Sequence, residues 1–184
     1  MKKGINKFIF LMILGAVPLL ALSSYGAMPE KNIKKNSIEN KDLIRILGEL
    51  SEFKTFRKKP AELNQLLMGA CVRTSETKDE VGTTSEYTCS PPSAIERVHL
   101  DLRQDESGGY VMALSVYYKY SEYDKVKKLS ENKLGRPSKK IEDMVIWKYV
   151  TDKGLNKLGN PVIYVDRDKE SKIASFQLGI EQGP

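Results

Sequence analysis

Few residues in this chain of 184 could do covalent chemistry. His99 is the only histidine, and Cys71 and Cys89 are the only cysteines. Hydrolases built on Ser-His-acid or Cys-His geometry need a histidine or an equivalent base beside the nucleophile. His99 stands between charged neighbours in a segment with strand-like alternation, which is typical of a surface position. The pattern therefore does not predict a nucleophilic hydrolase, and two cysteines without clustered histidines do not predict a zinc site.

Carboxylates are the other candidates for acid–base chemistry. They occur as close pairs at Asp105 and Glu106, at Glu142 and Asp143, and at Asp166 and Asp168. Each pair lies in or beside a predicted turn, where acidic residues are common for conformational reasons. The sequence holds no GxxxxGK phosphate loop and no metal-binding cluster. A hydrolase working through acidic residues stays open as an alternative, while no catalytic residue, metal or cofactor is predicted.

The first 27 residues have the three parts of a secretory signal. A lysine-rich start is followed by an apolar run over 8–22 and by small residues, which place cleavage near residues 23–27. The run is shorter than the roughly 20 residues that a membrane-spanning helix needs. No cysteine stands near the cleavage region, so we expect no lipid anchor. We predict an exported, periplasmic protein without stable membrane insertion.

The charge of the mature part does not indicate nucleic-acid binding. The chain has 30 basic and 24 acidic residues, and three lysines belong to the signal. The remainder carries 27 basic against 24 acidic residues, a net charge of +3. Nucleic-acid-binding domains concentrate basic residues on one face, whereas the charges here are mixed, except for lysines within 125–133. We interpret those lysines as the solvated face of a helix.

In an oxidising compartment, a single pair of cysteines predicts a disulfide. Cys71 and Cys89 both follow the signal, and their separation does not fit the Cys-x-x-Cys motif of redox-active pairs. We therefore expect a structural Cys71–Cys89 disulfide.

The mature chain has the length of one domain with a core of its own. Residues 28–40 are polar and predict a flexible lead-in, and residues 41–184 predict a single domain. Apolar residues at helical spacing from Lys41 to Phe53 indicate an amphipathic helix. A second helix is predicted from Pro60, because proline suits the first helical position.

Most of the remaining chain has the pattern of antiparallel strands. The predicted strands are 71–77, 84–89, 97–103, the return strand that ends at Lys119, 144–150, 162–167 and 173–180. Residues 105–109 supply a turn. In the return strand, Met112, Leu114, Val116 and Tyr118 are expected to face the core.

Residues 121–150 form the best-defined unit. Ser121 and Asp124 match a capping box and predict a helix from Glu122. Gly135 can adopt the left-handed conformation that ends a helix. The following strand, Met144–Val150, carries Trp147, the only tryptophan.

Residues 60–120 and 121–180 each contain one helix followed by several strands. We therefore predict an α+β fold with an antiparallel sheet and helices packed on one face. Two α-βββ units in tandem are one arrangement that fits this pattern.

The helix, Leu134-Gly-Arg-Pro137 and the strand with Trp147-Lys-Tyr149 resemble small periplasmic domains of the β-lactamase-inhibitor-like kind. The outer-membrane assembly lipoproteins belong to the same group. The resemblance covers residues 121–150, and the chain lacks the lipidated cysteine of those lipoproteins. What it implies is a fold that is used to bind other proteins.

A binding role suits the composition, because nine tyrosines offer large contact areas at low cost in side-chain entropy. The candidate partner-binding residues are Arg97, His99, Asp101, Arg103, Asp105, Glu106, Tyr117, Lys148 and Gln177. The leading hypothesis is a periplasmic inhibitor or immunity protein that blocks a toxic envelope-targeting enzyme. The alternative is a structural or assembly factor of the envelope. The oligomeric state is open.

Overall fold

The computed structural model describes residues 33–105, 108–149 and 159–181. The predicted signal with its cleavage region, the first residues of the predicted lead-in, and Glu106 lie outside the described residues. None of the helices in the described ranges combines the length and the apolar character that crossing a bilayer requires.

Two helices precede the sheet. α1 covers Ile33–Leu50 and is followed by the 3₁₀ helix η1, Phe53–Arg57, and by α2, Pro60–Leu67. The predicted start at Lys41 is therefore wrong, because α1 already begins at Ile33 in the polar segment that we expected to be a lead-in. Pro60 is the first residue of α2, as predicted.

Eight strands form one antiparallel sheet. They are β1 (Cys71–Lys78), β2 (Gly82–Cys89), β3 (Ile95–Asp105), β4 (Gly108–Lys119), β5 (Lys139–Ile141), β6 (Met144–Lys148), β7 (Asn160–Asp168) and β8 (Ile173–Glu181). Their order across the sheet is β1-β2-β3-β4-β8-β7-β6-β5. The helix α3, Tyr123–Leu134, stands between β4 and β5 in the chain, after the short 3₁₀ helix η2, Tyr120–Glu122.

The order of the strands divides the sheet into two similar halves. α2 precedes β1–β4, α3 precedes β5–β8, and the last strands of the two halves, β4 and β8, pair at the centre. The predicted α+β fold is confirmed, and the second half has four strands where the sequence predicted three. β5 escaped prediction because Lys139–Ile141 is short, rich in lysine and fully exposed.

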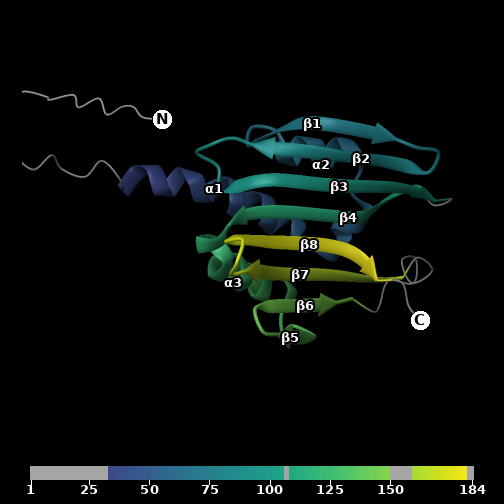
Figure 1. Ribbon diagram of the computed structural model, residues 1–184. Coiled ribbons are helices and arrows are strands. Elements are labelled where there is room, and N and C mark those ends of the chain that lie inside the picture. Colours follow the sequence, from purple (N-terminus) through teal and green to yellow (C-terminus); the bar gives the residue numbers. More distant parts are fainter. Residues whose placement is uncertain (1–32, 106–107, 150–158, 182–184) are drawn as a thin grey trace, which may run out of the picture. The chain divides into compact units, whose positions relative to one another are not determined.

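The helices all lie on the same side of the sheet (Figure 1). One continuous core joins them to it: α1 contributes Leu43, Ile46, Leu47 and Leu50, and β3 contributes Val98 and Leu100, all of them buried. Burial of this apolar layer is the main force that holds helices and sheet together. No helix within residues 33–105, 108–149 and 159–181 lies on the opposite side of the sheet.

A β-bulge shifts the predicted alternation in β4. Asp101 pairs with Ala113, but the next residue of β3, Leu102, pairs with Val111, so Met112 has no partner of its own in β3. An extra residue in one strand reverses the sides on which the following side chains point. Met112 is only half-buried and Val111 is fully buried, so the expectation that Met112 faces the core is wrong.

The end of α3 agrees with the sequence and its start does not. Ser121 belongs to η2, α3 begins at Tyr123, and no side chain caps the helix, so the predicted capping box is wrong. Gly135 ends α3 with a positive φ of 77°. Trp147 is buried in β6, and its indole N–H donates a hydrogen bond of 3.0 Å to the carbonyl oxygen of Gly135. This bond ties the end of α3 to the sheet.

Cys71 and Cys89 form the predicted disulfide. They are directly opposite each other in the pairing of β1 with β2. Because β1 is an edge strand, the disulfide fixes the border of the sheet at one point.

Candidate protein-binding surface

The side of the sheet opposite the helices is here called the open face, and no helix of the described residues covers it. Ile146 and Val162 point to this side and are nevertheless buried, so its exposed part lies chiefly over β2, β3, β4 and β8. One row of paired residues defines it from β2 to β6: Glu86, His99, Ser115, Gln177, Tyr164 and Ile146. Side chains at every second position along these strands point to the same side. Antiparallel sheets often combine a core side with a solvated side in this way.

Polar side chains in β3 alternate with core residues. Val98, Leu100 and Leu102 are buried. Arg97 and His99 point to the open face, as do Asp101 and Arg103, because each follows or precedes a buried residue of the same strand. The alternation predicted from the sequence therefore holds from Arg97 to Arg103, while a bulge interrupts it between Ile95 and Arg97.

Arg97 and His99 each contact a neighbouring strand. The guanidinium carbon of Arg97 lies 4.1 Å from the centre of the Tyr117 ring on β4, which is a cation–π contact. Nδ1 of His99 lies 2.5 Å from a carboxylate oxygen of Glu86 on β2. Both contacts join residues that are opposite each other in the sheet, so the strand register sets them.

Asp101 and Arg103 belong to a charged cluster at the far end of β3. Nε of Arg103 lies 3.1 Å from Asp101, and its Nη1 donates a 2.7 Å hydrogen bond to Asp79 in the β1–β2 turn. Thr84 adds a hydroxyl hydrogen bond of 3.3 Å to Asp101. The hydrogen bond from Arg103 holds the pKa of Asp79 below its ordinary value. Exposed ion pairs of this kind add little stability, but here they restrict where the long side chains can lie.

The other half of the sheet presents a smaller set of polar groups. Nζ of Lys148 lies 2.5 Å from a carboxylate oxygen of Glu181, and this hydrogen bond raises the pKa of Lys148. The side-chain amide of Gln177 donates a 3.0 Å hydrogen bond to the hydroxyl of Ser175. Between the two polar sets, β4 and β8 carry short residues, with Ala113 opposite Gly179.

Seven of the nine predicted binding residues therefore share the open face: Arg97, His99, Asp101, Arg103, Tyr117, Lys148 and Gln177. They do not form one tight cluster, because Lys148 belongs to β6, and three strands separate β6 from β3 in the sheet. The side chain of Asp105 and all of Glu106 lie outside the description. That any of these residues binds a partner stays a prediction.

The sequence did not single out the acidic partners of these residues. Glu86 and Glu181 became visible only through the pairing of strands, because each lies far along the chain from the cation that it contacts. Alternation within 84–89 places the side chains of Glu86 and Tyr87 on opposite sides of the sheet. The register with β3 was needed to pair Glu86 with His99.

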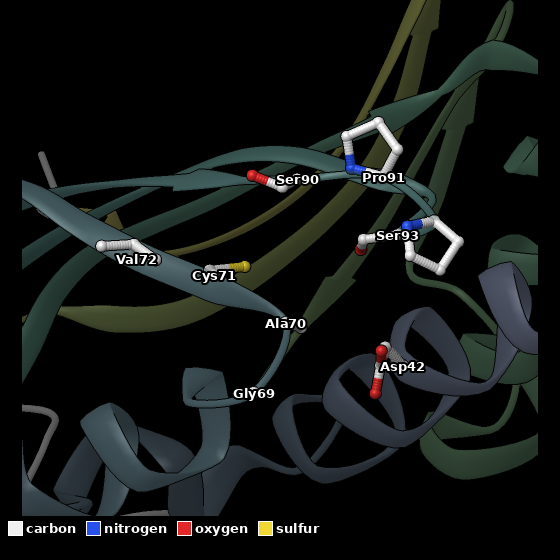
Figure 2. Close-up of a pocket in the computed structure, with 9 residues that line it drawn as sticks. Asp42, Gly69, Ala70, Cys71, Val72, Ser90, Pro91 and Ser93 are labelled. Carbon is white, nitrogen blue, oxygen red and sulfur yellow. The ribbon is translucent and has the colours of Figure 1, made fainter.

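A pocket of about 270 Å³ lies beside the disulfide, away from the centre of the open face. Figure 2 shows that Asp42 extends from α1 on one side, while Cys71, Val72 and the segment 90–93 form the other. Asp42 is the only charged residue in its lining, and it also lies 3.6 Å from Arg45. This lining contains no nucleophile paired with a base.

A second pocket, of about 460 Å³, lies between the β5–β6 and β7–β8 turns and is rich in carboxylates. Asp143 there contacts Arg167 at 2.8 Å and Lys169 at 2.6 Å. Hydrogen bonds from Lys169 and Arg167 hold the pKa of Asp143 below its ordinary value. A carboxylate stabilised in its charged form is a poor general acid. Within the described ranges, no group of three His, Cys, Asp or Glu residues is placed to hold a metal ion.

The aromatic neighbours of Arg167 close this region toward α3. Its guanidinium lies 4.4 Å from the centre of the Tyr123 ring, and the Tyr123 hydroxyl donates a hydrogen bond to the backbone carbonyl of Asp143. Burial raises the pKa of Tyr123 to about 12. The arrangement joins α3 to β7 and to the turn at Asp143, which is a structural role.

Comparisons of the chain with family models, with curated proteins and with solved structures find no match.

Proposed function

We propose that this chain is an exported protein-binding module that docks on its partner through the open face. The observation that carries the proposal is the state of that face: its long charged and aromatic side chains are held by cross-strand contacts before any partner arrives. Arg97 on Tyr117, His99 with Glu86, and Lys148 with Glu181 are the main examples. Ordering side chains in advance reduces the entropy that binding costs.

The chemistry of the open face favours a protein as the ligand. Positive and negative groups alternate over it, which suits a protein surface with its own mixed charges better than a uniformly anionic polymer. Short residues occupy the centre, where Ala113 and Gly179 lie between Asp101 on β3 and the buried Val162 on β7. The first pocket lies beside the disulfide, and the second lies at the β5–β6 and β7–β8 turns, where its lining shares Asp166 with the edge of the open face.

Among protein-binding modules, we propose an inhibitor or immunity protein that covers the working surface of a toxic enzyme of the cell envelope. A signal-like start, a disulfide and a rigid sheet suit a protein that acts outside the cytoplasm by occupying a surface. The likeness of residues 121–150 to periplasmic inhibitor-like domains supports the same class as a hypothesis. An envelope assembly factor would use the same face for a different partner.

Two glycine substitutions test the docking face as a matched pair. A side chain added at Gly179 on the open face would meet only the carbonyl oxygen of Met112 at 3.7 Å, and one added at Gly48 on α1 would meet nothing within 4 Å. The first carbon of a side chain therefore fits at both sites without a close contact. Gly179→Lys places a long charged side chain on the open face, and Gly48→Lys places the same side chain on the helix side.

The experiment is affinity capture of partners from envelope extracts and from competing strains, with the wild-type protein and both variants as baits. We expect one stoichiometric partner that the wild-type protein and Gly48→Lys retain and Gly179→Lys loses. A captured enzyme whose activity falls on binding supports the inhibitor, and capture of envelope machinery supports the assembly factor. Equal capture by all three baits contradicts the open face as the docking surface.

A further inference from the structure

Arg97 differs from the other cations in the central part of the open face. His99, Arg103 and Lys148 each contact a carboxylate. Among the described residues, no carboxylate forms an ion pair with Arg97, and its guanidinium donates no hydrogen bond; its contact is the ring of Tyr117. One positive charge in an otherwise paired set is thus left for an outside anion.

The contact with Tyr117 orients this charge. At 4.1 Å from the ring centre, the guanidinium lies over the aromatic face. Stacking on a ring leaves the N–H groups of the guanidinium edge available, and their fork geometry matches a carboxylate in two parallel hydrogen bonds. The Tyr117 hydroxyl also lacks a hydrogen-bond partner among the described residues, so a second donor is present beside the first.

The surroundings of Arg97 suit a partner side chain. In the row across the sheet, Arg97 lies between Thr88 on β2 and Tyr117 on β4, and the next residue is Ser175 on β8. Thr88 and Ser175 are short, so a side chain from a partner would reach the guanidinium over them. Two carboxylates lie near Arg97. Glu86 is paired with His99, and Glu96, which precedes Arg97 in a bulge of β3, is exposed and forms no ion pair with Arg97 among the described residues.

We propose that Arg97, held by Tyr117, binds an aspartate or glutamate side chain of the partner protein and is a principal anchor of the complex. This inference rests on the proposed function and specifies the partner's chemistry at one position. Arginine and tyrosine are among the residue types enriched at the positions that dominate the energy of protein interfaces. An exposed arginine that stays hydrated in the free protein becomes desolvated on docking, and it then requires an anionic partner to avoid a buried unpaired charge.

The test uses the partner captured with the wild-type protein and measures its affinity for four proteins. These are the wild-type protein, Arg97→Gln, Arg97→Lys and the control Arg45→Gln. Arg45 on α1 is an exposed arginine on the helix side of the domain, 3.6 Å from Asp42. We expect Arg97→Gln to weaken binding on the order of 30-fold, chiefly through faster dissociation, Arg97→Lys to weaken it less, and Arg45→Gln to leave it unchanged.

A double-mutant cycle distinguishes a direct contact from a merely structural role. Each aspartate and glutamate at the interface of the partner is changed to its amide, and each change is measured against both wild-type protein and Arg97→Gln. One carboxylate should weaken binding to the wild-type protein and have no further effect on Arg97→Gln. If no carboxylate behaves in this way, or if Arg97→Gln binds as tightly as the wild-type protein, the proposal is wrong.

The two proposals fail differently. If Gly179→Lys abolishes binding while Arg97→Gln binds normally, the open face docks the partner and only the role of Arg97 is refuted. If Gly179→Lys binds normally, the docking face itself is refuted, and the anchor with it. Circular dichroism and Trp147 fluorescence of every variant verify that the fold is intact.

Discussion

Loss of the disulfide is expected to destabilise the domain by an amount that follows from its position. Cys71 and Cys89 are 18 residues apart in the chain. In the chain-entropy description, opening a loop of that length costs about 3 kcal/mol of unfolding free energy at 25 °C, because the unfolded chain gains freedom. β1 pairs with β2 alone, and Cys71 is its only buried residue, so few side-chain contacts add to this pairing.

Urea unfolding measures this effect. Trp147 is 2% exposed in the folded protein, so its fluorescence reports the loss of the core. With a urea dependence of about 2 kcal/mol per molar, a loss of about 3 kcal/mol lowers the midpoint by about 1.5 M. The double variant Cys71→Ser/Cys89→Ser and the wild-type protein reduced with dithiothreitol should both show this shift.

Agreement between the double variant and the reduced protein is the control for the serine side chains themselves. Hydrogen exchange should in addition show faster exchange of β1 amides than of β4 amides after reduction, because β4 is at the centre of the sheet. A change of less than about 1 kcal/mol in both proteins would refute the reasoning, since the cross-link would then not restrict the unfolded chain.

Two other predictions concern polar groups in and near the core. The hydroxyl of Tyr118 is fully buried and has no hydrogen-bond partner among the described residues. Tyr118→Phe should therefore raise the unfolding free energy by about 1 kcal/mol. A lower unfolding free energy of this variant in urea would show that the hydroxyl has a favourable partner. Hydrogen bonds from Lys169 and Arg167 lower the pKa of Asp143, so this carboxylate stabilises the fold above about pH 4, and the stabilisation is lost as pH falls through the lowered pKa. Asp143→Asn should therefore lower the melting temperature at pH 7 and reduce its dependence on pH below about 4, and an unchanged acid dependence would contradict this role.

Local patterns were sufficient for most of the fold. Alternation placed β3 and its outward residues Arg97 and Arg103, and the spacing of apolar residues with Gly135 placed the end of α3. These features depend on a few neighbouring residues, whose backbone preferences and sidedness are written in the sequence itself. The two-half arrangement followed from the order of helices and strands.

The wrong predictions concern features that contacts between distant parts of the chain determine, or that leave no apolar pattern. Met112 was misplaced because the bulge depends on the pairing of β4 with β3, which the alternation of β4 alone does not contain. Ser121 matches a cap by residue type, but the chain enters α3 through a 3₁₀ turn instead. The helical start at Ile33 was missed because the polar residues there have no periodic apolar stripe.

The candidate surface was predicted in part for the same reason. Outward residues follow from alternation, whereas the partners Glu86 and Glu181 follow from strand register. His99, Arg103 and Lys148 each contact a carboxylate, whereas Arg97 contacts none among the described residues. This difference depends on how the strands pair, so no local sequence pattern predicts it.

The most direct test of the central claim is the affinity of the captured partner for Gly179→Lys compared with Gly48→Lys. The open-face account predicts that lysine at Gly179 abolishes binding, while the same change at Gly48 leaves the affinity at the wild-type value. Wild-type affinity for both folded variants would contradict it.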